Sequence, residues 1–156
     1  MNFFTYDLLI KLIASFMGSC AFAVVFKINK RHLLHVGILG FITYFAYYTV
    51  MFFTKSAFTA AFASTTVATL CAELLARKRH APTIVYLVTG LIPIVPGADS
   101  YYSMKYLLEQ NMPLATEKLL ATVQVALGIA GGIVVISTLF AILSDKLEAR
   151  RNKQKN

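Results

Sequence analysis

Four long apolar stretches constrain this sequence more than any other feature. They cover residues 8–26, 36–53, 57–75 and 121–143, and each is close to the ~20 apolar residues that a helix needs to cross the hydrocarbon core of a bilayer. Apolar residues make up 58% of the chain and charged residues only 14%, which leaves too little polar surface to cover a soluble core. The 156 residues are therefore predicted to form an all-α, polytopic membrane protein with a single membrane domain over residues 1–156.

A shorter apolar segment, residues 83–96, separates the third and the last of these stretches. It amounts to only about 20 Å of helix at 1.5 Å per residue, and Pro93, Pro96 and Gly97 interrupt it. Proline removes a backbone donor and glycine permits sharp bends, so the helix is expected to stop here. Three structures stay open: a short fourth span, a re-entrant hairpin, or the first half of a broken helix that continues through residues 101–108.

The basic residues predict how the chain is oriented. If all five segments cross, eleven Lys or Arg lie on one side and three on the other, a distribution that places the larger group in the cytoplasm. The larger group comprises Lys27, Lys30, Arg31, Arg77, Lys78, Arg79, Lys146, Arg150, Arg151, Lys153 and Lys155. About five transmembrane helices are therefore predicted, with the short Pro/Gly-broken segment as the fourth, the N-terminus outside and a basic cytoplasmic tail over residues 145–156. Such a tail binds anionic lipid headgroups, so the bilayer is an expected partner and nucleic acid is not.

The sequence contains no pattern typical of an enzyme active site. It has no nucleophile elbow, no His/Cys cluster with metal-ligand spacing and no glycine-rich phosphate loop. No catalytic residue, metal or cofactor is therefore predicted. His32, His35 and His80 lie beside Lys or Arg and are interpreted as interface residues without a ligand role.

The third stretch is rich in small and hydroxylated residues, among them Ser64, Thr65 and Thr69. Small residues let helix backbones approach closely in lipid, so this helix is expected at the centre of a bundle. Its hydroxyl groups either serve packing alone or face a polar pathway, and both interpretations stay open. Gly128 and Gly132 have the G-x-x-x-G spacing and predict a second close crossing.

Ionisable residues within or beside the spans are candidates for function. Glu73 precedes Arg77 by four residues, which is the favourable order for an ion pair on one helix face. A carboxylate within a span is alternatively a group that binds a proton and couples transport. Asp99 either caps a helix over residues 101–109 or lies in a broken helix where polar substrates bind. Lys11 is expected to extend towards the interface.

Several of these residues fall in recognisable runs. The runs are Ala72–Arg77, Ala81–Thr83 and Gly90–Gly97, followed by Tyr101 or Tyr102 and Met104, and preceded by Lys30, Arg31, Gly37 and Gly40. Together they resemble the threonine/serine exporter family over most of residues 27–104, and more closely its small, membrane-only component. Ile94 and Ala98 stand where that family more often has Leu and Ser.

The resemblance implies a subunit of a bacterial inner-membrane exporter of small polar metabolites. In the two-component form of the family, the small chain works with a larger partner subunit, and the implied cargo is a dicarboxylate such as succinate. A threonine/serine exporter subunit, which would carry a hydroxy amino acid, and a non-transporting scaffold for the partner are the alternatives. A homo-oligomer is left open.

For an exporter, we hypothesise roles for the residues singled out above. Residues 90–99 would line the path, and the Glu73–Arg77 pair would form an inner gate or a proton-coupling pair. The third helix would contribute hydroxyl groups. The substrate-path and coupling candidates are Glu73, Arg77, Pro93, Pro96, Gly97, Asp99, Ser64, Thr65 and Thr69.

Overall fold

The computed structural model describes residues 2–153, and the side chains of residues 6–144. The helices in this range are α1 (Asn2–Val25), α2 (Lys30–Thr54), α3 (Ala57–Arg79), α4 (Thr83–Leu91), the 3₁₀ turn η1 (Ile92–Ile94), α5 (Gly97–Leu108) and α6 (Met112–Lys153). No strand occurs within residues 2–153, so the predicted all-α, polytopic class is confirmed. Both α2 and α6 begin before the apolar stretches that predicted them: α2 starts among basic residues at Lys30, and α6 starts at Met112, ahead of the polar residues Thr116, Glu117 and Lys118.

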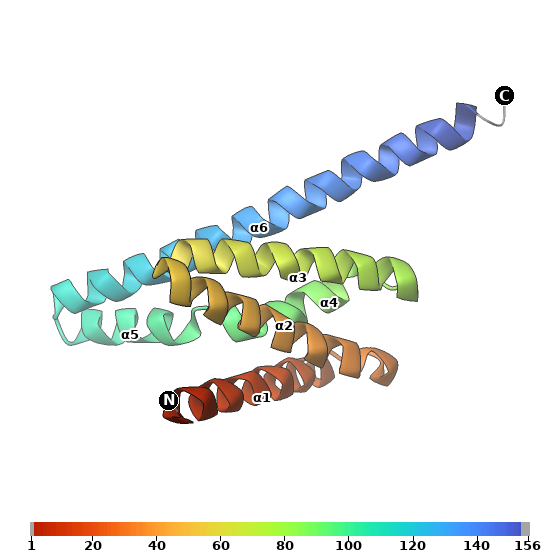
Figure 1. The fold of residues 1–156 in the computed structure, drawn as a ribbon. Coiled ribbons are helices and arrows are strands. Elements are labelled where there is room, and N and C mark those ends of the chain that lie inside the picture. The colour runs from red at the N-terminus through yellow and green to blue at the C-terminus, as the bar shows by residue number, and fades with distance from the viewer. Residues whose placement is uncertain (1, 154–156) are drawn as a thin grey trace.

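The helices alternate in direction between two ends of the bundle (Figure 1). One end holds the N-terminus and the connections at residues 55–56 and 109–111, and we call it the N-terminal end. The other, the C-terminal end, holds the connections at residues 26–29 and 80–82 and the end of α6. The helices α1, α2, α3 and α6 are each long and apolar enough to cross a membrane.

A bent pair of helices connects α3 to α6. The pair Thr83–Ile94 and Gly97–Leu108 is apolar enough to span a membrane, with a bend of 54° between its halves. The bend follows from Pro96, because the residue before a proline is pushed out of the helical region, and Val95 is extended at φ −62° and ψ 128°. In Figure 1 the pair runs from the C-terminal end to the N-terminal end, which is the broken-helix arrangement among the three that the sequence left open.

The core lies between α1, α2, α3 and α4. Its members are mainly small or aliphatic side chains: Ala23, Val36, Leu39, Ala68, Ala72, Ala76, Tyr86, Leu87, Leu91 and Ile94. The alanines on α3 let the short helix α4 pack close to α3. Close packing of small residues stabilises helix pairs in lipid. A Cβ atom on Gly90 would lie 2.6 Å from Cδ2 of Leu39, so α4 contacts α2 equally closely.

The predicted second close crossing is confirmed between α6 and α3. A Cβ atom at Gly128 would lie 2.7 Å from the carbonyl oxygen of Phe58, and one at Gly132 would lie 2.8 Å from that of Phe62. Because both obstacles are backbone atoms, no change of rotamer can relieve them. The two glycines therefore set the distance between α6 and α3.

Replacement of Gly128 by alanine tests this crossing. The added methyl group forces α6 away from α3, and such overpacking costs about 1–3 kcal/mol of the free energy of unfolding. We expect Gly128→Ala to lower the melting temperature of the purified protein in detergent. The matched control is Gly18→Ala on α1, where no atom lies within 4 Å of the added Cβ and alanine is the better helix former. Equal melting temperatures for the two variants would contradict the crossing's role in stability.

Candidate functional site

A cavity borders the break between α4 and α5. Its volume is about 320 Å³, and we call it the break cavity. It is lined by Lys11, Ala14, Ser15 and Gly18 of α1, Tyr44 of α2, and Ile92 and Pro93 of η1. The chain thus brings two sequence features, the proline break and a lysine within the first span, to the lining of one cavity.

Few polar groups enter the break cavity, and Lys11 is the charged one. Its Nζ atom donates to Oδ2 of Asp7 at 2.6 Å, one helical turn earlier on α1. Ser15 Oγ donates to the carbonyl oxygen of Lys11 at 2.7 Å, which leaves the oxygen lone pairs of this hydroxyl for a ligand. An ammonium group, a hydroxyl and the Tyr44 phenol in an otherwise apolar cavity can orient a small anionic or zwitterionic solute.

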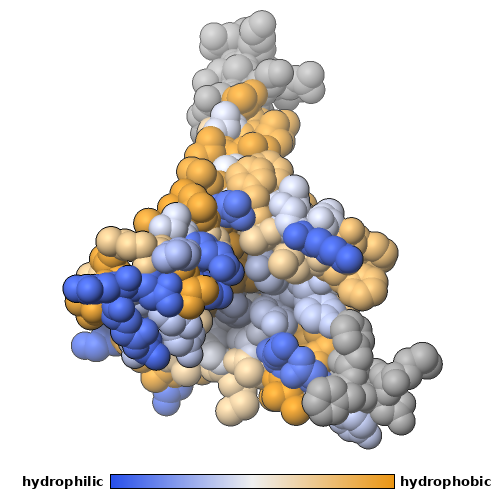
Figure 2. Space-filling model, turned by 90° about the vertical axis from the view of Figure 1, so that its left-hand side faces the viewer, coloured by the Kyte–Doolittle hydropathy of each residue, from blue (hydrophilic) through white to orange (hydrophobic). Residues whose placement is uncertain are grey.

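A second ion pair lies at the same end of the bundle. Lys118 Nζ on α6 donates to Asp99 Oδ1 on α5 at 2.9 Å, and each side chain is about one-third exposed. On α2, the ring centroids of Tyr44, which lines the break cavity, and Tyr47 are 6.4 Å apart. Figure 2 looks directly at this end and shows hydrophilic side chains around a central hollow.

Of the two interpretations of Asp99, the capping one is wrong. The helix α5 begins at Gly97, and its N-cap residue is Pro96, without a side-chain cap bond. Asp99 consequently lies inside the first turn, where its negative charge still suits the positive end of the helix dipole. Because α5 begins directly after Pro96, the Asp99 carboxylate does not cap the helix. It pairs with Lys118.

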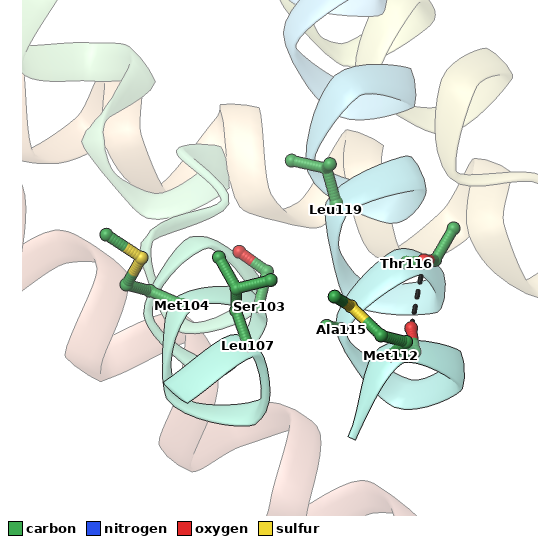
Figure 3. A pocket seen from close by; sticks show the side chains of 7 residues that line it. All are labelled: Ser103, Met104, Leu107, Met112, Ala115, Thr116 and Leu119. Atoms are coloured by element: carbon green, nitrogen blue, oxygen red, sulfur yellow. Dashed lines mark hydrogen bonds between the residues drawn. The ribbon is translucent and has the colours of Figure 1, made fainter. Parts of the chain in front are cut away.

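Another cavity separates α5 from α6, and Figure 3 shows the residues around it. It has a volume of about 180 Å³ and is lined by Ser103, Met104, Leu107, Met112, Ala115, Thr116 and Leu119. Its hydroxyls already donate within their own helices, Ser103 to the carbonyl of Ser100 at 2.8 Å and Thr116 to that of Met112 at 2.9 Å. No charged group lines it, so it lacks the chemistry to orient a polar solute.

The hydroxyl residues of α3 are buried and lie away from the break cavity. Ser64, Thr65 and Thr69 are fully buried. Ser64 Oγ donates to the carbonyl of Ala60 at 2.7 Å, and Thr69 Oγ1 donates to that of Thr65 at 2.8 Å. Thr65 Oγ1 has no partner among the described residues. None of the three lines the break cavity, so the structure does not bring them together with Pro93.

Glu73 and Arg77 lie near the C-terminal end, on the side of α3 that faces α6. Glu73 Oε2 is 4.0 Å from Arg77 Nε, and the Glu73 side chain is 17% exposed. Arg77 Nη2 donates to Ser144 Oγ at 2.9 Å, and its Cζ lies 4.9 Å above the ring of Phe140. This pair joins α3 to α6 and lies far along the bundle from Pro96, Gly97 and the break.

Sequence reasoning missed a polar cluster at the C-terminal end of the core. The Tyr86 hydroxyl lies 2.6 Å from His32 Nδ1, and Arg79 Nη2 lies 2.8 Å from His35 Nε2. The partners are 54 and 44 residues apart in the chain, so no local pattern joins them. Among the described residues, no three His, Cys, Asp or Glu side chains are grouped closely enough to hold a metal ion.

Comparison with known proteins gives one match. A family model described as Threonine/Serine exporter, ThrE, matches residues 11–139. This range includes the lining of the break cavity, the Asp99–Lys118 pair and the crossing of α6 on α3. No curated protein and no solved structure matches the chain.

A charge swap tests the pairing of Asp99 with Lys118. We expect Asp99→Lys to lower the melting temperature by a few degrees, because two ammonium groups would replace an ion pair 2.9 Å long. The double reversal Asp99→Lys with Lys118→Asp should restore it, since the attraction depends on the opposite signs and not on their order. If the double variant melts as early as the single one, the position of the carboxylate matters and the pairing does not.

Proposed function

The chain belongs to the threonine/serine exporter family, and from this we propose that the break cavity is the solute site of a small-metabolite exporter. Membership alone makes the chain an exporter-type membrane transporter subunit. The observation that supports the site is the location of Lys11 and Pro93 on the walls of one cavity. Discontinuous membrane helices place free backbone groups and helix ends where polar substrates bind.

The chemistry of the break cavity favours a solute that carries a carboxylate. Lys11 provides a positive charge and Tyr44 a phenol, and both suit a carboxylate oxygen. The cavity volume lies at the small end of the range for ligand pockets, which begins near 300 Å³. A dicarboxylate such as succinate is our first candidate, exported together with a larger partner subunit of the same family.

A hydroxy amino acid is the second candidate, and one contact favours it. Asp7 lies 2.6 Å from Lys11, so the cavity edge offers an acceptor for an ammonium group as well as a donor for a carboxylate. Threonine or serine carries both groups and a hydroxyl. The two candidates therefore differ in whether they need Asp7.

The remaining candidate residues have supporting roles in this proposal. The buried hydroxyls of Ser64, Thr65 and Thr69 follow α3 through the bundle, and Glu73 with Arg77 acts as a gate or a proton-coupling pair near the cytoplasm. The orientation is N-terminus outside and C-terminus inside, in the bacterial inner membrane. A non-transporting scaffold for the partner subunit is the rival proposal.

Efflux of labelled succinate and labelled threonine, from preloaded cells that lack both subunits, tests the site. The chain is supplied alone and then with its candidate partner. Lys11→Gln should lower export about tenfold or more, because a hydrogen bond to a charged group contributes ~1.5–3 kcal/mol. Asp7→Asn should lower export if the cargo is threonine or serine, and should leave export intact if the cargo is a dicarboxylate such as succinate. The matched control is Lys55→Gln, a lysine in the connection at the same end.

Three outcomes of this assay are decisive. Export that needs both chains and falls with Lys11→Gln supports the proposal and names the cargo. Equal loss of export in Lys11→Gln and Lys55→Gln would show that total charge matters and the break cavity does not. Equal efflux with and without the chain would make it a scaffold.

Neutralisation of Glu73 tests its proposed coupling role. If its carboxylate couples or gates transport, Glu73→Gln abolishes efflux while the assembled complex stays intact by size-exclusion chromatography. The matched control is Glu109→Gln, which breaks another pair at the same i,i+4 spacing, between Lys105 and Glu109 at 3.8 Å. Loss of the complex itself in Glu73→Gln would instead support an ion pair that only joins α3 to α6.

A further inference from the structure

Four side chains from three helices meet at the C-terminal end of the core. His32 and His35 come from α2, Arg79 from the last turn of α3 and Tyr86 from α4. We call them the His–Arg cluster. Tyr86 is fully buried, and its ring packs edge-on against His32 with centroids 5.5 Å apart. The cluster closes the end of the core from which α4 starts.

The chemistry of the Arg79 contact fixes the state of His35. An arginine only donates and stays protonated in proteins, so His35 Nε2 accepts from Arg79 and carries no proton. His35 is therefore neutral, with its proton on Nδ1. That Nδ1 atom is buried and has no hydrogen-bond partner among the described residues. The cluster thus contains a donor without an acceptor.

Among the side chains that the structure describes, Arg79 has no acidic partner. The ion pairs among the described side chains join Lys11 to Asp7, Arg77 to Glu73, Lys105 to Glu109 and Lys118 to Asp99. Glu73, the carboxylate on the same helix as Arg79, is thus directed to Arg77. The remaining N–H groups of Arg79 and the unpartnered Nδ1–H of His35 are donors that suit an oxyanion, whereas the Tyr86 hydroxyl and His32 Nδ1 already bond each other.

We propose that the His–Arg cluster binds a carboxylate of the exported solute before the solute reaches the break cavity. The proposal rests on the proposed function, because it takes the exporter's cargo as the ligand. Arg79 is exposed and is therefore reachable from the solution at the C-terminal end. The same short helix carries Tyr86 and leads to Pro93 at the break cavity, about 10 Å further along the axis at 1.5 Å per residue.

The test follows the histidine ring nitrogens by NMR. The full chain, with ¹⁵N-labelled histidine and its partner subunit where the complex requires it, is placed in phosphatidylcholine nanodiscs and titrated with succinate, then with threonine. We expect the ring signals of His35 to shift on titration, and Arg79→Gln to weaken the apparent affinity about tenfold. The matched control, Lys78→Gln, removes the same charge from the neighbouring residue and should change the affinity less than twofold.

Each other outcome overturns the proposal. An equal loss in Arg79→Gln and Lys78→Gln would reduce the effect to general electrostatic attraction. If the His35 signals shift when phosphatidylglycerol is included in the nanodisc, and do not shift when either solute is added, the cluster binds a lipid phosphate. Size-exclusion profiles and melting temperatures check that Arg79→Gln is folded, and Arg79→Lys, which keeps the charge, should regain part of the affinity.

The same variants separate this inference from the proposed function. One outcome is that Lys11→Gln abolishes export while neither solute shifts the NMR signals of His35. In that case the His–Arg cluster is not a solute site, and the break cavity remains the proposed solute site. If the His35 signals respond while Lys11→Gln exports normally, the solute is bound at the C-terminal end and the break cavity is the wrong site.

Discussion

Every backbone N–H and C=O group inside a bilayer has to find its partner within the protein, because no water is available there. The helices α1, α2, α3 and α5 each end near a residue with a left-handed conformation: Lys27, Lys55, His80 and Gln110. Such a residue lets a backbone N–H bond a carbonyl of the last helical turn. In Lys55, for example, the backbone N–H donates to the carbonyl of Met51 at 2.9 Å. The helix α4 is different, since it ends between the other helices. That single interior helix end is the feature on which the proposed site depends.

Close packing makes such an interior end tolerable. Water does not drive helices together in lipid, so contact area and small side chains do. A Cβ atom on Gly37 would lie 2.6 Å from the sulfur of Cys20, and one on Gly40 would collide with the Ser19 side chain. With Gly90 against Leu39 and the glycines of α6 against α3, these contacts hold the long helices rigidly around the short one. The break can then carry function without loosening the bundle.

The sequence predicted the features that depend on local pattern. Apolar length predicted the long helices, proline spacing predicted the break, and the glycines at 128 and 132 predicted the crossing of α6 on α3. The i,i+4 spacing of Glu73 and Arg77 also predicted their proximity. The capping role of Asp99 failed because helix starts are fixed by one or two residues, and α5 begins at Gly97. The break cavity and the His–Arg cluster join residues of separate helices, which no local pattern can bring together.

The short helix α4 relates the two proposed sites to each other. It has nine residues, with Tyr86 of the His–Arg cluster near its start and Pro93 of the break cavity just beyond its end. The bend of 54° separates it from α5, which pairs with α6 through Asp99 and Lys118. The close contact of Gly90 with Leu39 holds α4 against α2, so the packing of α4 in the core sets the distance between the two proposed sites.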